Sequence, residues 1–244
     1  MTIHRFHVPA ASPGVMDLPE NARNHVTRVL RLAEGDALRV FDAGREFGAT
    51  IRAIEKHRVV IDVGEAATDP PERSAPLHLL MSPLKGDLTE LVIQKAIELG
   101  AARISPVVFE RTDTVARREP GEARRERWHR VATSAAEQSG RAVVPRLDDV
   151  IVLKLAAEAL GAPAEGENRI VATEPRVGEG DAALSAPARV RSVVVAVGPA
   201  GGLSPGDLAT LTAAGFTPER FALHTLRSET ACIAALAILG DRYR

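Results

Sequence analysis

Cysteine is almost absent from this chain of 244 residues, because Cys232 is the only one. A single thiol excludes an internal disulfide and a zinc site built from several cysteines, and it suits a reducing compartment. Histidine does not supply a metal site instead, since His4 and His7 are close together but have no third ligand in a nearby motif. The sequence therefore predicts a protein without a bound metal.

Long apolar runs are also missing. Runs such as Ser192–Val197 end well before the roughly 18 to 20 residues that a membrane span needs. The first residues, MTIHRFHVPA, lack the apolar stretch of a signal peptide. A hydrophobic share of 45% is nevertheless enough for an ordinary buried core. We therefore expect a globular, cytoplasmic protein with no membrane partner.

An excess of charge of one sign is lacking too, because the formal net charge is −1. This balance argues against a nonspecific nucleic-acid binder. Arginine is nevertheless concentrated in one segment, at positions 111, 117, 118, 124, 125, 127, 130, 141 and 146. Guanidinium groups suit bidentate phosphate contacts, but a solvated helix with arginines paired to Glu119, Glu122 and Glu126 explains the segment equally well. Charge alone leaves both interpretations open.

The polar, proline-containing stretch 69–76 interrupts the apolar periodicity and predicts a linker between two domains. Before it, in residues 1–68, short runs rich in Val and Ile at 37–41, 49–54 and 59–63 predict a small β domain. We expect one helix within it, at residues 20–30. Arg28 and Arg31 near the end of this helix offer two guanidinium groups to a partner, although an exposed helix end is the simpler interpretation.

After the linker, in residues 77–244, strand and helix patterns alternate, which predicts an α/β domain with a mostly parallel sheet. In the helix expected at 88–99, Asp87 is predicted to cap the N-terminus, and Leu88, Leu91, Val92 and Leu99 to share one face. The other expected strands are 77–81, 104–108, 168–173, 192–197 and 220–223, and the other expected helices are 122–139, 205–214 and 229–239.

Two turns after predicted strands are candidates for a binding site, because ligands of open parallel sheets lie beyond the carboxyl ends of the strands. The first is the glycine-rich loop from Gly198 to Ser204, which leads into a helix with Ser204 as its predicted cap and Asp207 closing a capping box. It matches neither a Walker phosphate loop nor the G-x-G-x-x-G spacing. By itself the loop fits either a ligand site or a structural turn.

The second turn carries Arg227 and Glu229 at the start of a predicted helix, where free backbone amides are presented. Such a pair is either a surface ion pair or a site that orients a substrate and handles a proton.

Together these stretches resemble the RsmE branch of the SPOUT methyltransferases along nearly the whole chain. The matching strings in the N-terminal domain are Arg28-Val-Leu-Arg31 and Glu34-Gly-Asp36. Those in the C-terminal domain are residues 85–88, 90–100, 110–112, 127–128, 135–141, 197–199, 201–204, 226–227 and 229–231. Several specific strings in the family's order make coincidence the weaker explanation.

The resemblance implies a SPOUT-type α/β knot, in which the C-terminal third forms a trefoil knot, with a small N-terminal PUA-like β-barrel domain that binds RNA. It also implies a homodimer and the cofactor S-adenosyl-L-methionine, held mainly by backbone groups. By similarity, the cofactor-binding residues are Thr173, Val197, Gly198, Gly202, Leu223, Leu226 and Arg227.

The activity that the resemblance implies is methylation of N3 of one uridine in 16S ribosomal RNA of the small ribosomal subunit. The catalytic candidates are Arg227, which would stabilise the uracil anion, and Glu229, which would act as the base. The RNA-binding candidates are Arg28, Arg31, Lys85, Arg111, Gln138 and Arg141. With only 3% aromatic residues, we expect recognition by charge and shape rather than by broad base stacking.

Two features depart from the family's pattern: Ala200 stands where relatives usually have Glu, and His224 lies in an unusual stretch before Arg227. Ala200 removes a carboxylate, so a noncatalytic RNA-binding assembly factor remains an alternative. A SPOUT methyltransferase acting on another RNA, such as transfer RNA, is a second one. Cofactor binding separates the first from an enzyme, and the identity of the methylated base separates the two enzymes.

Overall fold

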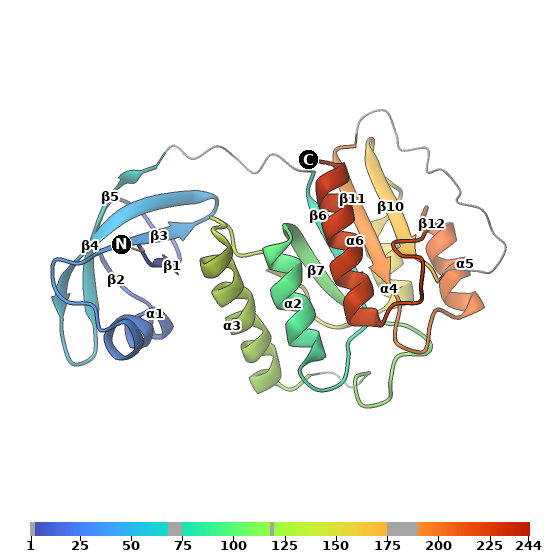
Figure 1. The fold of residues 1–244 in the computed structure, drawn as a ribbon, viewed down its shortest axis with the longest axis horizontal. Coiled ribbons are helices and arrows are strands. Elements are labelled where there is room, and N and C mark those ends of the chain that lie inside the picture. The colour runs from blue at the N-terminus through green and yellow to red at the C-terminus, as the bar shows by residue number, and fades with distance from the viewer. Residues whose placement is uncertain (1–2, 68–74, 118–119, 175–189) are drawn as a thin grey trace. The chain divides into compact units, whose positions relative to one another are not determined.

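A computed structural model describes residues 3–67, 75–117, 120–174 and 190–244 (Figure 1). The chain divides into two compact units, one of residues 1–72 and 133–144 and the other of residues 73–132 and 145–244. The linker expected at 69–76 lies outside the described residues, except for Ala75 and Pro76.

The first unit is built on a five-stranded sheet with the order β1-β3-β4-β5-β2. β1 pairs with β3 in parallel, and the other neighbouring strands are antiparallel. The strands are β1 Arg5–His7, β2 Gly14–Asp17, β3 Ala37–Asp42, β4 Arg45–Ile54 and β5 Val59–Ala66. β3, β4 and β5 contain the predicted strands, whereas the short β1 and β2 lack a pattern strong enough to predict them.

The helix predicted at 20–30 consists of two parts, α1 Glu20–Asn24 and the π-helical turn η1 His25–Leu30. Arg31 ends the turn in the left-handed conformation, with φ of 54°. Ala22 and Val26 are buried against the sheet, so this segment closes the core of the unit. The wider turn leaves Arg28 and Val29 exposed.

The C-terminal end of α3 Glu122–Ser139 belongs to the first unit from Thr133 onward. The Arg5 guanidinium donates to the backbone carbonyls of Glu137, at 3.3 Å, and Arg141, at 3.2 Å. The backbone N–H of His7 donates to Glu137 Oε1 at 3.0 Å. The bond to Glu137 satisfies a carbonyl group that the helix end leaves unpaired, and together the three bonds fasten the end of α3 and the residues after it to β1.

The second unit contains a seven-stranded sheet with the main order β12-β10-β11-β6-β7-β8, and β9 pairs with β7. Its neighbouring strands are parallel, as predicted. The strands are β6 Leu77–Met81, β7 Ala101–Val108, β8 Arg146–Leu147, β9 Ile151–Val152, β10 Glu167–Ala172, β11 Ser192–Val197 and β12 Thr217–Glu219.

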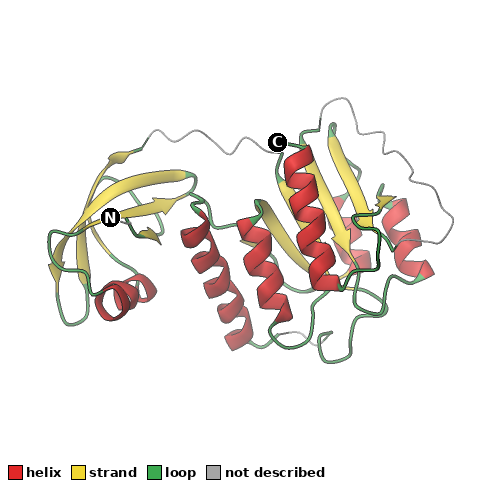
Figure 2. Cartoon of the chain, viewed as in Figure 1, coloured by secondary structure: helices red, strands yellow, loops and turns green. Residues whose placement is uncertain are grey.

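Helices cover both faces of this sheet (Figure 2). α2 Leu88–Glu98 and α6 Ser228–Arg242 pack side by side on one face, and α4 Leu153–Leu160 and α5 Pro205–Ala213 pack together on the other. Successive strand residues point to opposite faces. Leu80, Val194 and Ala196 accordingly join the core beneath α4 and α5. Helices exclude water from both faces of the sheet, which explains the continuous apolar pattern of β11.

Two predictions about α2 are wrong. Asp87 makes no capping bond, and its carboxylate instead accepts a hydrogen bond from Arg127 at 3.3 Å. Of the predicted face Val92 is buried, and the other buried apolar residues are Ile93, Ala96 and Ile97, whereas Leu88 and Leu91 are more than a third exposed. The helix therefore packs on the sheet through a different face and leaves two leucines at the surface.

Two buried polar clusters support the second sheet. His78 Nε2 lies 2.7 Å from Ser105 Oγ, which in turn donates to Asp148, and Asp148 also accepts from Arg103 at 2.6 Å. On the other side, Arg169 is almost fully buried and donates to the carbonyls of Gly161, Ala214 and Leu160. These carbonyls end α4 and α5, so Arg169 caps both helices at once.

Candidate functional site

A cavity of about 720 Å³ lies in the second unit beyond the carboxyl ends of β10 and β11. The glycine-rich loop, the segment 221–227 and the first turn of α6 form its wall. Its volume is typical of a site that encloses a small organic molecule. The residues that line it are Leu88, Arg111, Ala172, Thr173, Glu174, Val197, Gly198, Pro199, Ala200, Gly201, Gly202, Leu203, Leu208, Phe221, Ala222, His224, Thr225, Leu226, Arg227, Ser228, Glu229 and Ala231.

The glycine-rich loop is a tight turn that only small residues permit. Gly202 donates its N–H to the carbonyl of Pro199 at 2.9 Å and has φ of 72°, which favours glycine. A Cβ at Gly198 would lie 2.8 Å from the Leu203 side chain, so the loop closes on itself without space for another side chain. Its backbone can therefore lie directly against a ligand.

The helix after the glycine-rich loop begins as the sequence predicts. Ser204 Oγ accepts the backbone N–H of Asp207 at 3.0 Å, and Asp207 Oδ2 accepts that of Ser204 at 3.0 Å. Together with Pro205 at the first position of α5, this is the expected capping box.

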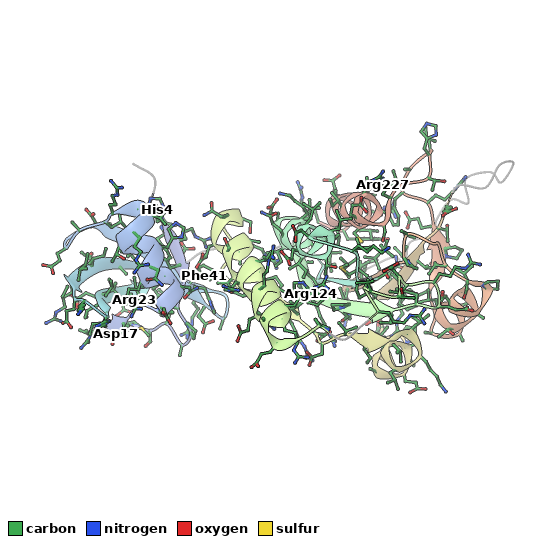
Figure 3. The ribbon with its side chains drawn as sticks, turned by 90° about the horizontal axis from the view of Figure 1, so that it is seen from below. His4, Asp17, Arg23, Phe41, Arg124 and Arg227 are labelled. Carbon is green, nitrogen blue, oxygen red and sulfur yellow. The ribbon has the colours of Figure 1, made fainter. Side chains whose placement is uncertain are left out.

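The first turn of α6 forms the opposite wall. Ser228 Oγ donates to the carbonyl of Gly198 at 2.7 Å, which ties the helix to the glycine-rich loop. Arg227 and Glu229 flank this serine and both line the cavity, and Figure 3 labels Arg227 beside α6. A guanidinium and a carboxylate therefore stand next to free amides at a helix N-terminus, a setting that favours negative charge on a ligand.

The predicted cofactor residues lie together with one exception. Thr173, Val197, Gly198, Gly202, Leu226 and Arg227 line the cavity. Leu223 lies outside this lining with 89% of its surface exposed. The strand predicted at 220–223 is also wrong, because β12 ends at Glu219 and the following residues form the loop at the cavity wall.

Glu219, at the end of β12, holds Thr173 of the cavity lining in place. Thr173 donates its backbone N–H, at 2.9 Å, and its Oγ1, at 3.3 Å, to the carbonyl of Glu219. The Glu219 carboxylate is paired with Arg242 at 2.7 Å. Burial raises the pKa of this carboxyl, and the bond from Arg242 opposes the effect. The pair fastens the end of α6 to the strand that positions Thr173.

The predicted RNA-binding residues are distributed over both units. Arg28 and Arg31 are exposed on and beside η1 in the first unit, which also contains the exposed Gln138 and the buried Arg141, 8% exposed. In the second unit Arg111 lines the cavity.

Lys85 is exposed in the second unit and forms an ion pair with Asp113 at 2.9 Å. The hydrogen bond from Lys85 lowers the pKa of the Asp113 carboxyl. Lys85 is therefore available to a phosphate at the surface, in exchange for a weak ion pair.

Several arginines of the basic segment have structural partners. Arg127 pairs with Glu90 at 2.8 Å, Arg124 stacks over Trp128, and Arg117 donates to the carbonyl of Glu110. Glu119, one of the acids expected to pair with the arginines, lies outside the described residues together with Arg118. The segment thus contributes both to the fold and to the exposed basic surface.

Sequence reasoning missed Glu174, Leu88 and Phe221 as lining residues. Glu174 follows β10 directly, so the rule about carboxyl ends of strands was sufficient to find it. Leu88 and Phe221 are apolar residues without a motif, and only the fold brings them to the cavity.

In the ranges that the structure describes, no cluster of His, Cys, Asp and Glu side chains is suited to hold a metal ion. None of the helices within those ranges has the length and apolar character of a membrane span.

Comparison with known proteins connects this geometry to a family. A family model described as RNA methyltransferase domain matches residues 71–240, and one described as RNA methyltransferase PUA domain matches residues 18–64. One similar solved structure is ribosomal RNA small subunit methyltransferase E from Neisseria gonorrhoeae, bound to S-adenosyl methionine. It is 28% identical with a TM-score of 0.83, and the alignment covers 99% of this chain and 98% of that one. A Legionella pneumophila protein in complex with the same cofactor has 26% identity and a TM-score of 0.85, with coverage of 99% and 98%.

Curated relatives agree with the structures. Ribosomal RNA small subunit methyltransferase E of Synechocystis is 30% identical over 88% of this chain and 69% of its own length. The protein of the same name from Bacillus subtilis is 29% identical, covering 89% of this chain and 86% of its own. The chain therefore belongs to the RNA methyltransferase family, in the group whose curated members are named ribosomal RNA small subunit methyltransferase E.

Proposed function

We propose that this protein is an enzyme that transfers a methyl group from S-adenosyl-L-methionine to N3 of a specific uridine in the 16S RNA of the small ribosomal subunit. The observation that carries this proposal is the cavity between the glycine-rich loop and the first turn of α6, with Arg227 and Glu229 at its wall. Family membership supplies the class of reaction, and the relatives' name supplies the small-subunit RNA.

The cavity suits the cofactor in shape and chemistry. Leucines 203, 208 and 226 and Val197 offer an apolar surface to the adenine ring, and the backbone of the glycine-rich loop offers donors and acceptors without side chains in the way. The Thr173 hydroxyl donates to the carbonyl of Glu219, and its oxygen would accept a hydrogen bond from a ligand hydroxyl. When bound, S-adenosyl-L-methionine supplies a methyl group made electrophilic by its positively charged sulfur.

The two charged residues of α6 would perform the proton chemistry. N3 of neutral uracil carries a proton and is a poor nucleophile until that proton leaves. Glu229 would accept the proton while Arg227 stabilises the negative charge that develops on the uracil ring. Methylation of N3 would form the N3–carbon bond while the carbon–sulfur bond breaks, and the electron pair of that bond would remain on sulfur. Holding N3 in line with the methyl group would supply much of the remaining acceleration.

The RNA must present the uridine unpaired or flipped out, because N3 lies on its base-pairing edge. Arg111 at the cavity and Lys85, which pairs with Asp113 two residues after Arg111, would hold phosphates close to the target. Arg28, Arg31, Gln138 and Arg141 of the first unit would contact other parts of the RNA. We assign the PUA-like RNA-binding domain to residues 1–68 and the methyltransferase domain to residues 77–244, and the latter would contribute Lys85, Arg111, Gln138 and Arg141 as further RNA contacts.

A trefoil knot in the C-terminal third is part of the proposal. β12 lies at one edge of the sheet, whereas α6 packs on β6 and β11 in its middle. The segment 220–227 must therefore run back past the glycine-rich loop, and both segments line one cavity. We infer that this crossing is threaded, which is rare in proteins.

We further propose that the enzyme is a cytoplasmic homodimer. Leu88 and Leu91 of α2 and Ile238 of α6 are exposed on two helices that lie side by side. We infer that these side chains form part of an apolar surface that a second copy covers about a twofold axis.

The deciding experiment is methyl transfer from labelled S-adenosyl-L-methionine to purified small ribosomal subunits that lack the N3-methyluridine mark, followed by nucleoside analysis and mapping. We expect label in one uridine of 16S RNA. Transfer to another RNA, such as transfer RNA, would replace the proposed substrate. If the cofactor binds neither alone nor with subunits, a noncatalytic assembly factor becomes the better interpretation.

The roles of the charged pair are tested by Glu229→Gln and Arg227→Ala. We expect each to lower kcat by at least about a hundredfold, since a positioned general base or a charge-stabilising group contributes on that order. Glu158→Gln, at an exposed position of α4, serves as the matched control. Equal rates for Glu229→Gln and this control would exclude Glu229 as the base.

A further inference from the structure

The turn that follows β7 is anchored at both of its ends. Thr112 donates its N–H to the carbonyl of Phe109 at 3.2 Å, and Thr112 Oγ1 accepts the N–H of Phe109 at 2.8 Å. The same hydroxyl lies 3.0 Å from Ser82 Oγ. Phe109 and Thr112 are buried, whereas the two residues between them, Glu110 and Arg111, are exposed. The hydrogen bonds of Thr112 therefore fix the backbone from which these two side chains project.

Arg111 lies directly against the glycine-rich loop. A Cβ at Gly201 would come within 3.3 Å of Arg111 Cβ and within 3.4 Å of its carbonyl oxygen. Arg111 Nη1 reaches the carbonyl of Gly201 at 3.4 Å, while the side chain stays exposed. Its guanidinium is therefore placed at the cavity by the loop on which it rests.

Asp207 joins these two segments. Its Oδ2 accepts the N–H of Ser204 at the end of the glycine-rich loop, at 3.0 Å. Its Oδ1 accepts the N–H of Glu110 in the turn, at 3.1 Å. Only 5% of its surface is exposed, so the carboxylate makes these bonds away from most of the solvent. The capping box of α5 accounts for the bond to Ser204. The bond to Glu110 lies outside the capping box and connects residues that are far apart in the sequence.

We propose that Asp207 is a positioning residue for the reaction, which fixes Arg111 relative to the glycine-rich loop. Through this carboxylate, the guanidinium that contacts an RNA phosphate keeps a constant distance from the loop that surrounds the methyl donor. The inference rests on the proposed function and adds a residue that touches neither substrate. Its effect should appear in the KM for RNA more than in the Kd for the cofactor.

The test compares Asp207→Ala with Ser204→Ala in the full-length protein. Ser204→Ala removes only the hydroxyl that accepts the Asp207 N–H and so controls for loss of the helix cap. We expect Asp207→Ala to raise the KM for small-subunit RNA roughly tenfold, in the range of measured couplings between contacting residues. Ser204→Ala should leave this KM within about twofold of the wild-type value, by the same measure. Asp207→Asn, which keeps the shape and one acceptor oxygen, replaces Asp207→Ala if that variant does not fold.

A double-mutant cycle with Arg111→Ala separates positioning from general destabilisation. If Asp207 acts through Arg111, the double variant Arg111→Ala/Asp207→Ala should have the same KM for RNA as Arg111→Ala alone. Additive effects would overturn the proposal, and so would an equal rise in KM for Ser204→Ala and Asp207→Ala.

Hydrogen exchange supplies a readout that does not depend on activity. The amide of Glu110 should exchange faster in Asp207→Ala than in Ser204→Ala, because only the former removes its acceptor. Equal exchange in the two variants would contradict the link. If wild-type protein methylates no small-subunit RNA, the proposed function fails, whereas this comparison still decides whether Asp207 holds the turn.

Discussion

At the scale of single residues, Gly198 illustrates how the cavity depends on the absence of a side chain. The space in which its Cβ would stand is occupied by Leu203, at 2.8 Å. Its carbonyl also accepts the Ser228 hydroxyl, so a shift of Gly198 moves the contact between the loop and α6. A change at this position therefore reaches both walls of the cavity.

We expect Gly198→Ala to weaken cofactor binding by roughly tenfold or more, because overpacking typically costs about 1 to 3 kcal/mol. Isothermal titration with S-adenosyl-L-methionine measures the effect. Gly206→Ala is the matched control, since a Cβ there meets its nearest atom at an ordinary 3.6 Å. Unchanged affinity in Gly198→Ala would mean that Leu203 yields without disturbing the loop.

His78 gives the second unit a dependence on pH. Burial lowers the pKa of this imidazole from 6.5 to about 4, and the positive charge of Arg103 adds to the effect. Between pH 6.5 and 4, His78 therefore binds a proton in the unfolded chain but stays largely neutral in the folded protein. Stability is complete above pH 6.5 and falls as the pH drops toward 4, by about 3 kcal/mol if the whole shift is expressed.

The measurement is urea unfolding at several pH values between 4.5 and 7.5, followed by fluorescence of Trp128, the only tryptophan, which is buried in this unit. His78→Gln keeps a hydrogen-bonding group for Ser105 that does not titrate. We expect the loss of stability between pH 6.5 and 4.5 to shrink in this variant. The same slope in both proteins would assign the pH dependence to other groups.

At the scale of elements, the C-terminal ends of α4 and α5 depend on one side chain. Arg169 donates to three of their carbonyls and pairs with Glu167 at 2.6 Å. Arg169→Met keeps much of the volume but leaves the carbonyls and a largely buried carboxylate without a partner. We expect a loss of about 3 kcal/mol or more in the free energy of unfolding.

Thermal or urea unfolding checks this expectation against Lys95→Met, which breaks a more exposed ion pair with Glu98 on α2 of the same unit. Such pairs contribute about 0 to 1 kcal/mol. Similar losses in the two variants would contradict the capping role of Arg169.

The sequence predicted the elements whose signals are local. α3 and β11 have the predicted bounds, and the capping box of α5 follows from Ser204 and Asp207 alone. β12 was misplaced because its position is set by pairing of Thr217 and Glu219 with β10, a contact between distant segments. The π-helical η1 was missed because it differs from an ordinary helix in its backbone hydrogen bonds, such as the one from the Arg31 N–H to the Val26 carbonyl, and residue types do not reveal these.

The same distinction applies to the candidate site. The glycine-rich loop and the Arg227 and Glu229 pair have recognisable local patterns, and both lie at the cavity. The contact of Arg111 with Gly201 joins residues ninety positions apart, and no spacing rule predicts it.

At the scale of the whole molecule, the exposed residues of α2 and α6 predict the oligomeric state. We expect sedimentation to report a dimer for the wild-type protein and a monomer for Leu91→Glu/Ile238→Glu, because buried carboxylates without partners are costly. Leu155→Glu is the control, since Leu155 is 50% exposed but lies on α4, on the other face of the sheet. A wild-type monomer, or a dimer that survives the double change, would contradict the proposed interface.

The place of α6 in the fold has a consequence for how the protein is made. This helix covers β6 and β11 and supplies one wall of the cavity, yet it is the last element in the sequence. During translation the strands of the first unit can pair early, because all of them are synthesised before residue 67. The sheet of the second unit keeps apolar residues exposed to solvent until α6 has been synthesised. A chain interrupted before Ser228 would therefore be a substrate for chaperones and proteases, and methyl transfer would be confined to molecules whose synthesis has passed that point.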